Sequence, residues 1–388
     1  AKRIINKTTG VPEDHILMSA THTHSATSAG GEGEKRRGWN VGKPLDEYQA
    51  FLARRIADGV QVALNNLEPA RIGWGAGSVP QHVFNRRWKL KPGTPNLSPF
   101  GIQEQALMNP GINNPNLLEP AGPTDPGISF ISVQSLTGRP IALLGNYSLH
   151  YVGGLPNDHI SADYFAVFAD RIQELLKADR QDPPFVSMLS NGTSGDVNNV
   201  NVRGGAERLP YYKKMQIVAN DLAEEVLRVH NSIKYHEWVQ LKAVQSELTL
   251  KVRHPDAGLV KWAKQVIEQP DTVKPKHRLE KTYAERTLQM QEWPENINVI
   301  LQTFRIGDLG IAAVPFEVFA ETGLVIKAKS PFKTSFTIEL ANGGYGYLPT
   351  PAQHKLGGYE TWLSTNRVET EASEKIVTEL MKLFSKLK

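Results

Sequence analysis

The feature that most constrains this chain is a long alternation of apolar, strand-like runs with amphipathic, helix-like stretches. Apolar runs of strand length occur at residues 16–21, 128–134, 141–149, 184–189, 239–252, 298–306, 309–314 and 334–340. Apolar residues spaced three and four apart predict helices at residues 45–67, 165–177, 211–229, 316–329 and 369–387. Strands that alternate with helices are typical of α/β proteins. We therefore expect an α/β fold with a mixed, largely parallel sheet flanked by helices.

Two stretches depart from this alternation. Residues 90–127 are rich in proline, glycine and asparagine and predict a long irregular excursion. Such a loop is usually a functional lid or a surface covering, but a disordered surface insert would have the same composition. Residues 254–294 are charged and mostly helical in pattern, and we interpret them as an insertion over the core.

Composition and charge exclude several classes of protein. The net charge is +4 and is spread along the chain, whereas nucleic-acid binding requires a concentrated basic face. No apolar run reaches the roughly 18 residues of a membrane-spanning helix, so we expect no membrane span. The chain has no cysteine, so a zinc ion would need nitrogen and oxygen ligands. The sequence does not indicate an oligomeric state.

Groups suited to catalysis follow the ends of five predicted strands. In open α/β sheets, ligand sites lie at the carboxyl ends of strands. Each group alone has an ordinary explanation, such as a polar turn, a hydrogen-bonded core histidine or a carboxylate at a helix start. Two histidines and one glutamate form a known catalytic zinc set, so together they predict a zinc site. The groups are His22 and His24, His150, the loop at 191–196, Glu317 and the loop at 342–347.

These segments, in this order, resemble motifs of the neutral (non-lysosomal) ceramidases. Thr21–Ser25 resembles the family's zinc-binding His-x-His motif, and Asn146–His150 resembles the strand that carries its second zinc histidine. The remaining matches are Asn85–Arg86, the Ser194–Asn198 loop, Val314–Glu317, Asn342–Thr350 and Tyr359–Glu360. The resemblance extends over about residues 10–365 and depends on the combination of motifs.

The resemblance implies a single ceramidase-like catalytic domain over residues 1–388 that binds Zn²⁺. It implies zinc ligands at His22, His150, Glu317 and Tyr347, catalytic residues His24, Arg86 and Tyr359, and substrate-binding residues Asn85 and Asn198. It also implies a small-molecule or lipid-like substrate and a secreted or periplasmic location. The chain itself begins at Ala1 without a signal-peptide pattern. The family's immunoglobulin-like domain has no counterpart in it, so we expect the catalytic domain alone.

One departure from the family affects the expected substrate. Asn198 stands where the family has a serine, and several asparagines lie nearby in residues 191–201. We therefore expect a zinc-dependent hydrolase that cleaves an amide (N-acyl) bond in a substrate more polar than ceramide. Arg86 would stabilise the oxyanion, His24 would carry the proton and Tyr359 would donate a hydrogen bond. The alternatives are an enzyme of the same fold that acts on esters or polar glycans, and a non-catalytic binding homologue.

Overall fold

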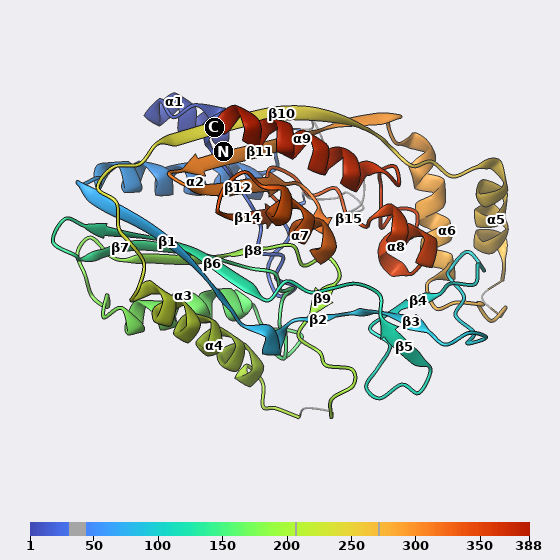
Figure 1. The fold of residues 1–388 in the computed structure, drawn as a ribbon. Helices are drawn as coiled ribbons and strands as arrows, with labels where there is room; N and C mark the ends of the chain where they lie inside the picture. Colours follow the sequence, from blue (N-terminus) through green and yellow to red (C-terminus); the bar gives the residue numbers. More distant parts are fainter. Residues whose placement is uncertain (31–43, 206–207, 271) are drawn as a thin grey trace.

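The computed structural model describes residues 1–30, 44–205, 208–270 and 272–388 (Figure 1). Two four-stranded sheets form its centre. The strands of the first sheet, in spatial order, are β1 (Ala70–Ser78), β6 (Gly127–Ser135), β7 (Pro140–Tyr147) and β8 (Val186–Asn191). Those of the second are β10 (Leu241–Lys251), β11 (Asn296–Ile306), β12 (Leu309–Val314) and β14 (Thr334–Glu339). These sheets confirm the predicted α/β class with mixed strands.

The expectation of largely parallel strands is wrong. In these two sheets only β7–β8 and β12–β14 pair in parallel, and the other neighbours are antiparallel. Short turns at Gly138 and Gly307, both with positive φ, join β6 to β7 and β11 to β12. Such tight connections force antiparallel pairing, whereas a parallel pair needs a longer crossover, here the helices α3 (Asp163–Leu175) and α7 (Ala320–Lys329).

The sheets and helices form four layers, with the two sheets face to face and helices outside each (Figure 1). Helices α3 (Asp163–Leu175) and α4 (Lys213–His230) cover the first sheet, and α7 (Ala320–Lys329) and α9 (Ala372–Leu387) cover the second. The apolar layer between the sheets includes Ile131, Ile311 and Phe336. Strand β7 pairs in parallel with β8, and β12 pairs in parallel with β14. The carboxyl ends of each pair therefore lie at the same edge of their sheet.

Strand β1 does not show the apolar run expected of a buried strand, because glycine occupies positions 73, 75 and 77. A Cβ on Gly75 would lie 2.8 Å from Val229 and 2.9 Å from Ile233. A Cβ on Gly77 would meet the side chain of Glu225. The missing side chains therefore allow α4 and the segment after it to pack directly against the strand.

The predicted strand at residues 16–21 is not a strand. It forms one isolated bridge, between Ser19 and Ala341, and two backbone hydrogen bonds with the segment after β14. Its residues are exposed or half-buried rather than buried. Leu17 packs at the margin of the apolar layer between the sheets, so the run's apolar character serves packing rather than strand pairing.

The two predicted excursions lie at the same end of the molecule (Figure 1). Residues 90–127 are ordered: β4 (Ala106–Met108) and β5 (Leu117–Pro120) flank β3 (Arg87–Leu90) in a small sheet. Residues 254–294 contain the helices α5 (Ala257–Glu268) and α6 (Glu280–Gln289), as their pattern predicted.

The remaining elements are short or peripheral. They are α1 (Lys2–Thr9), α2 (Glu47–Asn65), α8 (Pro351–Leu356) and the pairs β2 (Phe84–Asn85) with β9 (Val197–Asn198) and β13 (Glu317–Val318) with β15 (Tyr347–Leu348). Among the described residues, no helix has the length and apolar character needed to cross a bilayer.

Candidate metal centre

Three of the four predicted zinc ligands converge on one point. Glu317 Oε2 lies 3.2 Å from His22 Nε2 and 3.5 Å from His150 Nε2. The imidazole rings of His22 and His150 meet edge to face, with their centroids 5.0 Å apart. These residues come from sequence positions more than a hundred apart, so the fold itself assembles the cluster.

His150 is held by a hydrogen bond to the neighbouring loop. It follows β7, and its Nδ1 lies 2.8 Å from the carbonyl oxygen of Ser194, in the loop after β8. An Nδ1–H that donates to a carbonyl leaves Nε2 as the free nitrogen, which is the usual arrangement of a metal-binding histidine. Ser194 is held in turn, because its hydroxyl lies 2.5 Å from Glu339 Oε1 and its backbone N–H donates to Glu339 Oε2.

Glu317 and Tyr347 are neighbours across a two-stranded ladder. The predicted helix at 316–329 begins at Ala320 instead, and Glu317 lies in β13, directly paired with Tyr347 in β15. Gly195 allows the loop after β8 to approach, since a Cβ there would lie 2.5 Å from the carbonyl oxygen of Glu317. Burial raises the pKa of Tyr347 well above its ordinary value, so its phenol is protonated in this environment.

His22 and His24 bring their rings together through a bent backbone. His22 has a φ of 59°, in the left-handed region, rather than the extended conformation expected after a strand. Nevertheless His24 Nε2 lies 3.4 Å from His22 Nε2, and the ring of His24 stacks on Tyr151 at a centroid distance of 3.9 Å. Burial and the imidazoles of His22 and His150 lower the pKa of His24 to about 4. His24 is therefore neutral at pH 7.

Arg86 is fixed by a buried ion network. Its Nε lies 3.0 Å from Glu360 Oε1, and Nη1 of the neighbouring Arg87 lies 2.6 Å from Glu360 Oε2. The guanidinium of Arg86 sits over the ring of Tyr347, with Cζ 5.3 Å from the centroid. Its Nη2 is buried without a hydrogen-bond partner. Burial opposes the charge of Arg86, but Tyr347 and Glu360 outweigh this effect and raise its pKa.

Two cavities open beside this cluster. The larger, of about 440 Å³, is lined by His24, Arg86, Tyr347 and Tyr359, together with residues of the α6 region. The smaller, of about 290 Å³, is lined by Arg86, His150 and Asn198. Tyr151 and Asn109 border both cavities, so the two spaces meet at the cluster.

Asn85 is not among the residues that line these cavities. Its Nδ2 donates to Asp196 Oδ2 at 2.8 Å, and its Oδ1 accepts the backbone N–H of Arg87 at 3.0 Å. Both polar groups of the Asn85 amide thus bond to other parts of the protein, and these bonds position the backbone on either side of Arg86. The structure brings together the other predicted residues, namely His22, His24, Arg86, His150, Asn198, Glu317, Tyr347 and Tyr359.

The donor set fits a metal ion. Glu317 Oε2 is buried and has no hydrogen-bond partner. Burial alone would raise the pKa of Glu317, but the adjacent imidazoles of His150 and His22 hold it well below its usual range. An ionised carboxylate oxygen beside imidazole nitrogens is suited to a cation. The imidazole nitrogens of His22, His24 and His150 also lie within 4.8 Å of one another, so His24 is a further possible ligand.

Sequence reasoning missed the residues that support the cluster. Glu339 is fully buried at the end of β14 and accepts hydrogen bonds from Ser194 and from the backbone of Val318. The sequence signal that could have identified Glu339 is a carboxylate inside the apolar run at 334–340. The α6 residues that line the larger cavity gave no such signal, because their placement depends on tertiary packing.

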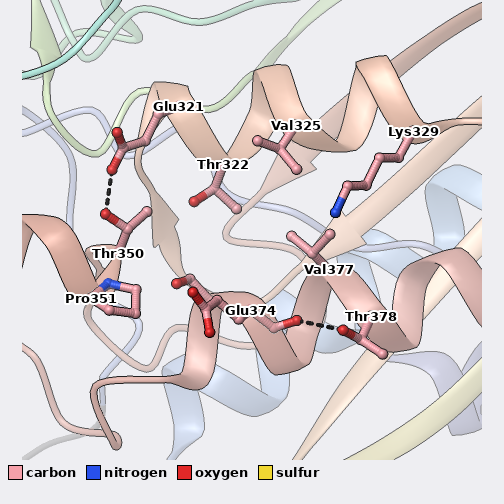
Figure 2. Close-up of a pocket in the computed structure, with 10 residues that line it drawn as sticks. Glu321, Thr322, Val325, Lys329, Thr350, Pro351, Glu374, Val377 and Thr378 are labelled. Atoms are coloured by element: carbon pink, nitrogen blue, oxygen red, sulfur yellow. Dashed lines mark hydrogen bonds between the residues drawn. The ribbon is translucent and has the colours of Figure 1, made fainter.

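Another cavity, of about 470 Å³, lies between α7 and α9 (Figure 2). Thr350 donates a hydrogen bond to the carboxylate of Glu321 at its edge, which ties the start of α8 to α7. Val325 and Val377 form its apolar sides. None of the predicted site residues lines it, so it is separate from the metal centre.

No protein-family model matches the chain, and no curated protein sequence matches it either. Solved structures do. A neutral ceramidase from Pseudomonas aeruginosa superposes with a TM-score of 0.67 at 15% identity, over 99% of this chain and 63% of the other. A ceramidase complexed with C2 gives 0.66 at 16% identity, over 99% and 64%. This chain therefore has a ceramidase-like fold. It spans less than two thirds of the length of these ceramidases.

Proposed function

We propose that this protein is a zinc-dependent hydrolase that cleaves an amide (N-acyl) bond. The observation that carries the proposal is the buried, unsatisfied Glu317 carboxylate oxygen between the Nε2 atoms of His22 and His150. The ceramidase-like fold supports the assignment to hydrolases. His22, His150, Glu317 and Tyr347 would hold the metal. When bound, zinc supplies Lewis acidity and a water of lowered pKa.

The chain's own residues account for the other requirements of amide hydrolysis. Arg86 carries a permanent positive charge and has an unused N–H at Nη2, which suits an oxyanion that develops on the substrate carbonyl. His24 is neutral at pH 7, so it can accept a proton and return it to the departing amine. The hydroxyl of Tyr359, in the wall of the larger cavity, would donate a hydrogen bond to the substrate.

A second candidate function is suggested by the smaller cavity. Asn109, Asn198 and Asn199 line it, and their amides both donate and accept hydrogen bonds. These amides would bind hydroxyl groups of a substrate, so the same centre would then serve an enzyme that acts on esters or polar glycans. A panel of N-acyl, O-acyl and glycan substrates distinguishes this candidate from an amidase.

The decisive experiment measures metal and activity together. Protein purified without added metal should contain about one zinc per chain, as expected for a mononuclear site. Glu317→Gln should lose that zinc, whereas Glu321→Gln, a matched change four residues later on α7, should keep it. A chelator should abolish amide hydrolysis, and zinc should restore it. Metal-free protein whose hydrolytic activity resists the chelator would overturn the proposal.

A further inference from the structure

The larger cavity carries two arginines that the reaction as described does not use. Arg278, just before α6, and Arg286, on α6, line the cavity that also contains His24, Arg86 and Tyr359. We call these two residues the arginine wall. In the described part of the chain, neither Arg278 nor Arg286 forms an ion pair.

The cavity's own acidic residue, Glu104, forms no ion pair with the arginine wall. Both carboxylate oxygens of Glu104 accept from Trp362 Nε1, at 2.8 and 3.0 Å. Glu360, behind the cavity, is held between Arg86 and Arg87. The positive charge of the wall is therefore available to a bound molecule.

Arg286 is held in place by its neighbours. Its Cζ lies 4.5 Å from the ring centroid of Tyr283, and its Nε is buried without a hydrogen-bond partner. The Tyr283 ring meets Trp362 at 5.2 Å, Trp362 meets Tyr359 at 5.6 Å, and Tyr359 meets Tyr347 at 5.8 Å. A continuous aromatic surface thus joins Arg286 to the metal centre.

The smaller cavity has a different lining. It contains Ile112, Val152, Val200 and Val202 together with asparagines, and no arginine besides Arg86, which both cavities share. Apolar side chains suit a short acyl chain, whereas unpaired guanidinium groups suit an anion. Apolar side chains such as Leu107 and Met108 also line the larger cavity, but only that cavity adds Arg278 and Arg286. The two sides of the reaction centre therefore differ in charge, which suits them to different halves of a substrate.

Resting on the proposed function, we propose that the substrate is an N-acyl amine whose amine half carries an anionic group. The acyl chain lies in the smaller cavity, and Arg278 and Arg286 bind the anion in the larger one. N-acyl amino acids and their sulfonate analogues belong to this class, and neutral N-acyl amino alcohols do not. Arg278 and Arg286 are specificity residues in this assignment, since they contact the substrate away from the scissile bond.

The test uses uncleavable ligands, so that it does not depend on turnover. 4-Oxoundecanoic acid replaces the amide N–H of octanoylglycine with a methylene, and 1-hydroxyundecan-4-one is its neutral counterpart. Isothermal titration calorimetry on the full chain as purified should show the acid binding roughly ten- to a hundredfold more tightly, the range expected for hydrogen bonds to charged groups. Arg286→Gln and Arg278→Gln should each reduce that preference, and Arg55→Gln, an exposed arginine on α2, should not.

The outcomes separate the two proposals. Equal affinity for acid and alcohol, failure of both to bind, or a preference that survives in both cavity variants would overturn the inference. Arg278 is exposed, so its variant decides the matter even if Arg286→Gln fails to fold. A parallel assay compares cleavage of octanoylglycine, octanoyltaurine and octanoylethanolamine. Cleavage of all three at equal kcat/KM overturns the inference and leaves the hydrolase standing. Tight acid binding without metal or cleavage overturns the hydrolase alone, and the first two substrates distinguish carboxylate from sulfonate.

Discussion

Glu360→Gln tests whether the buried ion network is what holds Arg86 at the reaction centre. Glu360 and Arg87 are fully buried, and 7% of the Arg86 side chain is exposed. Each carboxylate oxygen of Glu360 serves one guanidinium, at 3.0 and 2.6 Å. Glutamine keeps the shape of glutamate but offers one oxygen only. One guanidinium therefore loses its acceptor and meets an NH₂ donor instead.

The expected effect on stability follows from this geometry. Removal of one partner from a buried ion pair destabilises a protein by about 3–5 kcal/mol, because a charge is left uncompensated. The unfolding entropy of about 2.1 cal/mol/K per residue, over 388 residues, is about 0.8 kcal/mol/K. The Tm should therefore fall by about 4–6 °C if the chain unfolds in one transition. The kcat/KM should fall as well, since Arg86 is no longer fixed beside Tyr347.

Differential scanning calorimetry and kinetics on the same preparations measure both effects. Asp58→Asn is the matched control, because the Arg55–Asp58 pair is 60% and 56% exposed and such pairs contribute about 0–1 kcal/mol. Its Tm should change by about 1 °C or less. If Glu360→Gln unfolds within about 1 °C of the wild type, the network does not stabilise the fold and this account of Arg86 fails.

Three further outcomes are expected. His22→Ala should lose zinc, whereas His24→Ala should keep it and lose roughly 10²–10⁴ in kcat; elemental analysis showing the reverse would exchange the two roles. Asn198→Ser removes the 2.7 Å hydrogen bond to Asn109 and should shift kcat/KM from small polar substrates toward a fluorescent ceramide at unchanged zinc content; an unchanged ratio would show that position 198 does not select substrate. Burial raises the pKa of Asp196 to about 6 from 3.8. The stabilisation that the protonated carboxyl gives the folded state is therefore fully present below about pH 4 and is lost as the pH rises through about 6. The stability of wild type relative to Asp196→Asn should therefore fall by about 2 kcal/mol between pH 4 and pH 7, and urea denaturation showing a pH-independent difference would contradict this.

Local patterns predicted most elements of the fold but not the direction of its sheets. Strands such as β12 and helices such as α9 could be predicted because the spacing of their apolar residues matches that of a strand or a helix. Strand direction depends on connection length, and the tight turns at Gly138 and Gly307 made four strands antiparallel to a neighbour. The sequence did not predict strand β1, because its alternating glycines interrupt any apolar run. These glycines allow close contact with α4, which only the folded structure reveals.

The site was predictable where its residues follow strand ends and match a motif. To predict the contact between His150 and Glu317, it was enough to place each residue just after a predicted strand and to expect those strand ends to lie together. The network of Arg86, Arg87 and Glu360 joins residues more than 270 positions apart, and no local pattern encodes such a pairing. The same holds for Arg278 and Arg286, which reach the cavity through the packing of residues 254–294.

The two buried glutamates of the centre have opposite roles because their surroundings differ. Imidazoles flank Glu317 and lower its pKa, so it is anionic. Burial, and after it the charge of Glu317, raises the pKa of Glu339 well above the ordinary value. Environments that push the pKa values of two nearby carboxyl groups apart assign them different tasks. Glu339 serves as a hydrogen-bonding support for Ser194 and, through it, for His150. Glu317 then supplies a buried negative charge beside the imidazoles, and this anion makes the cluster suited to a cation.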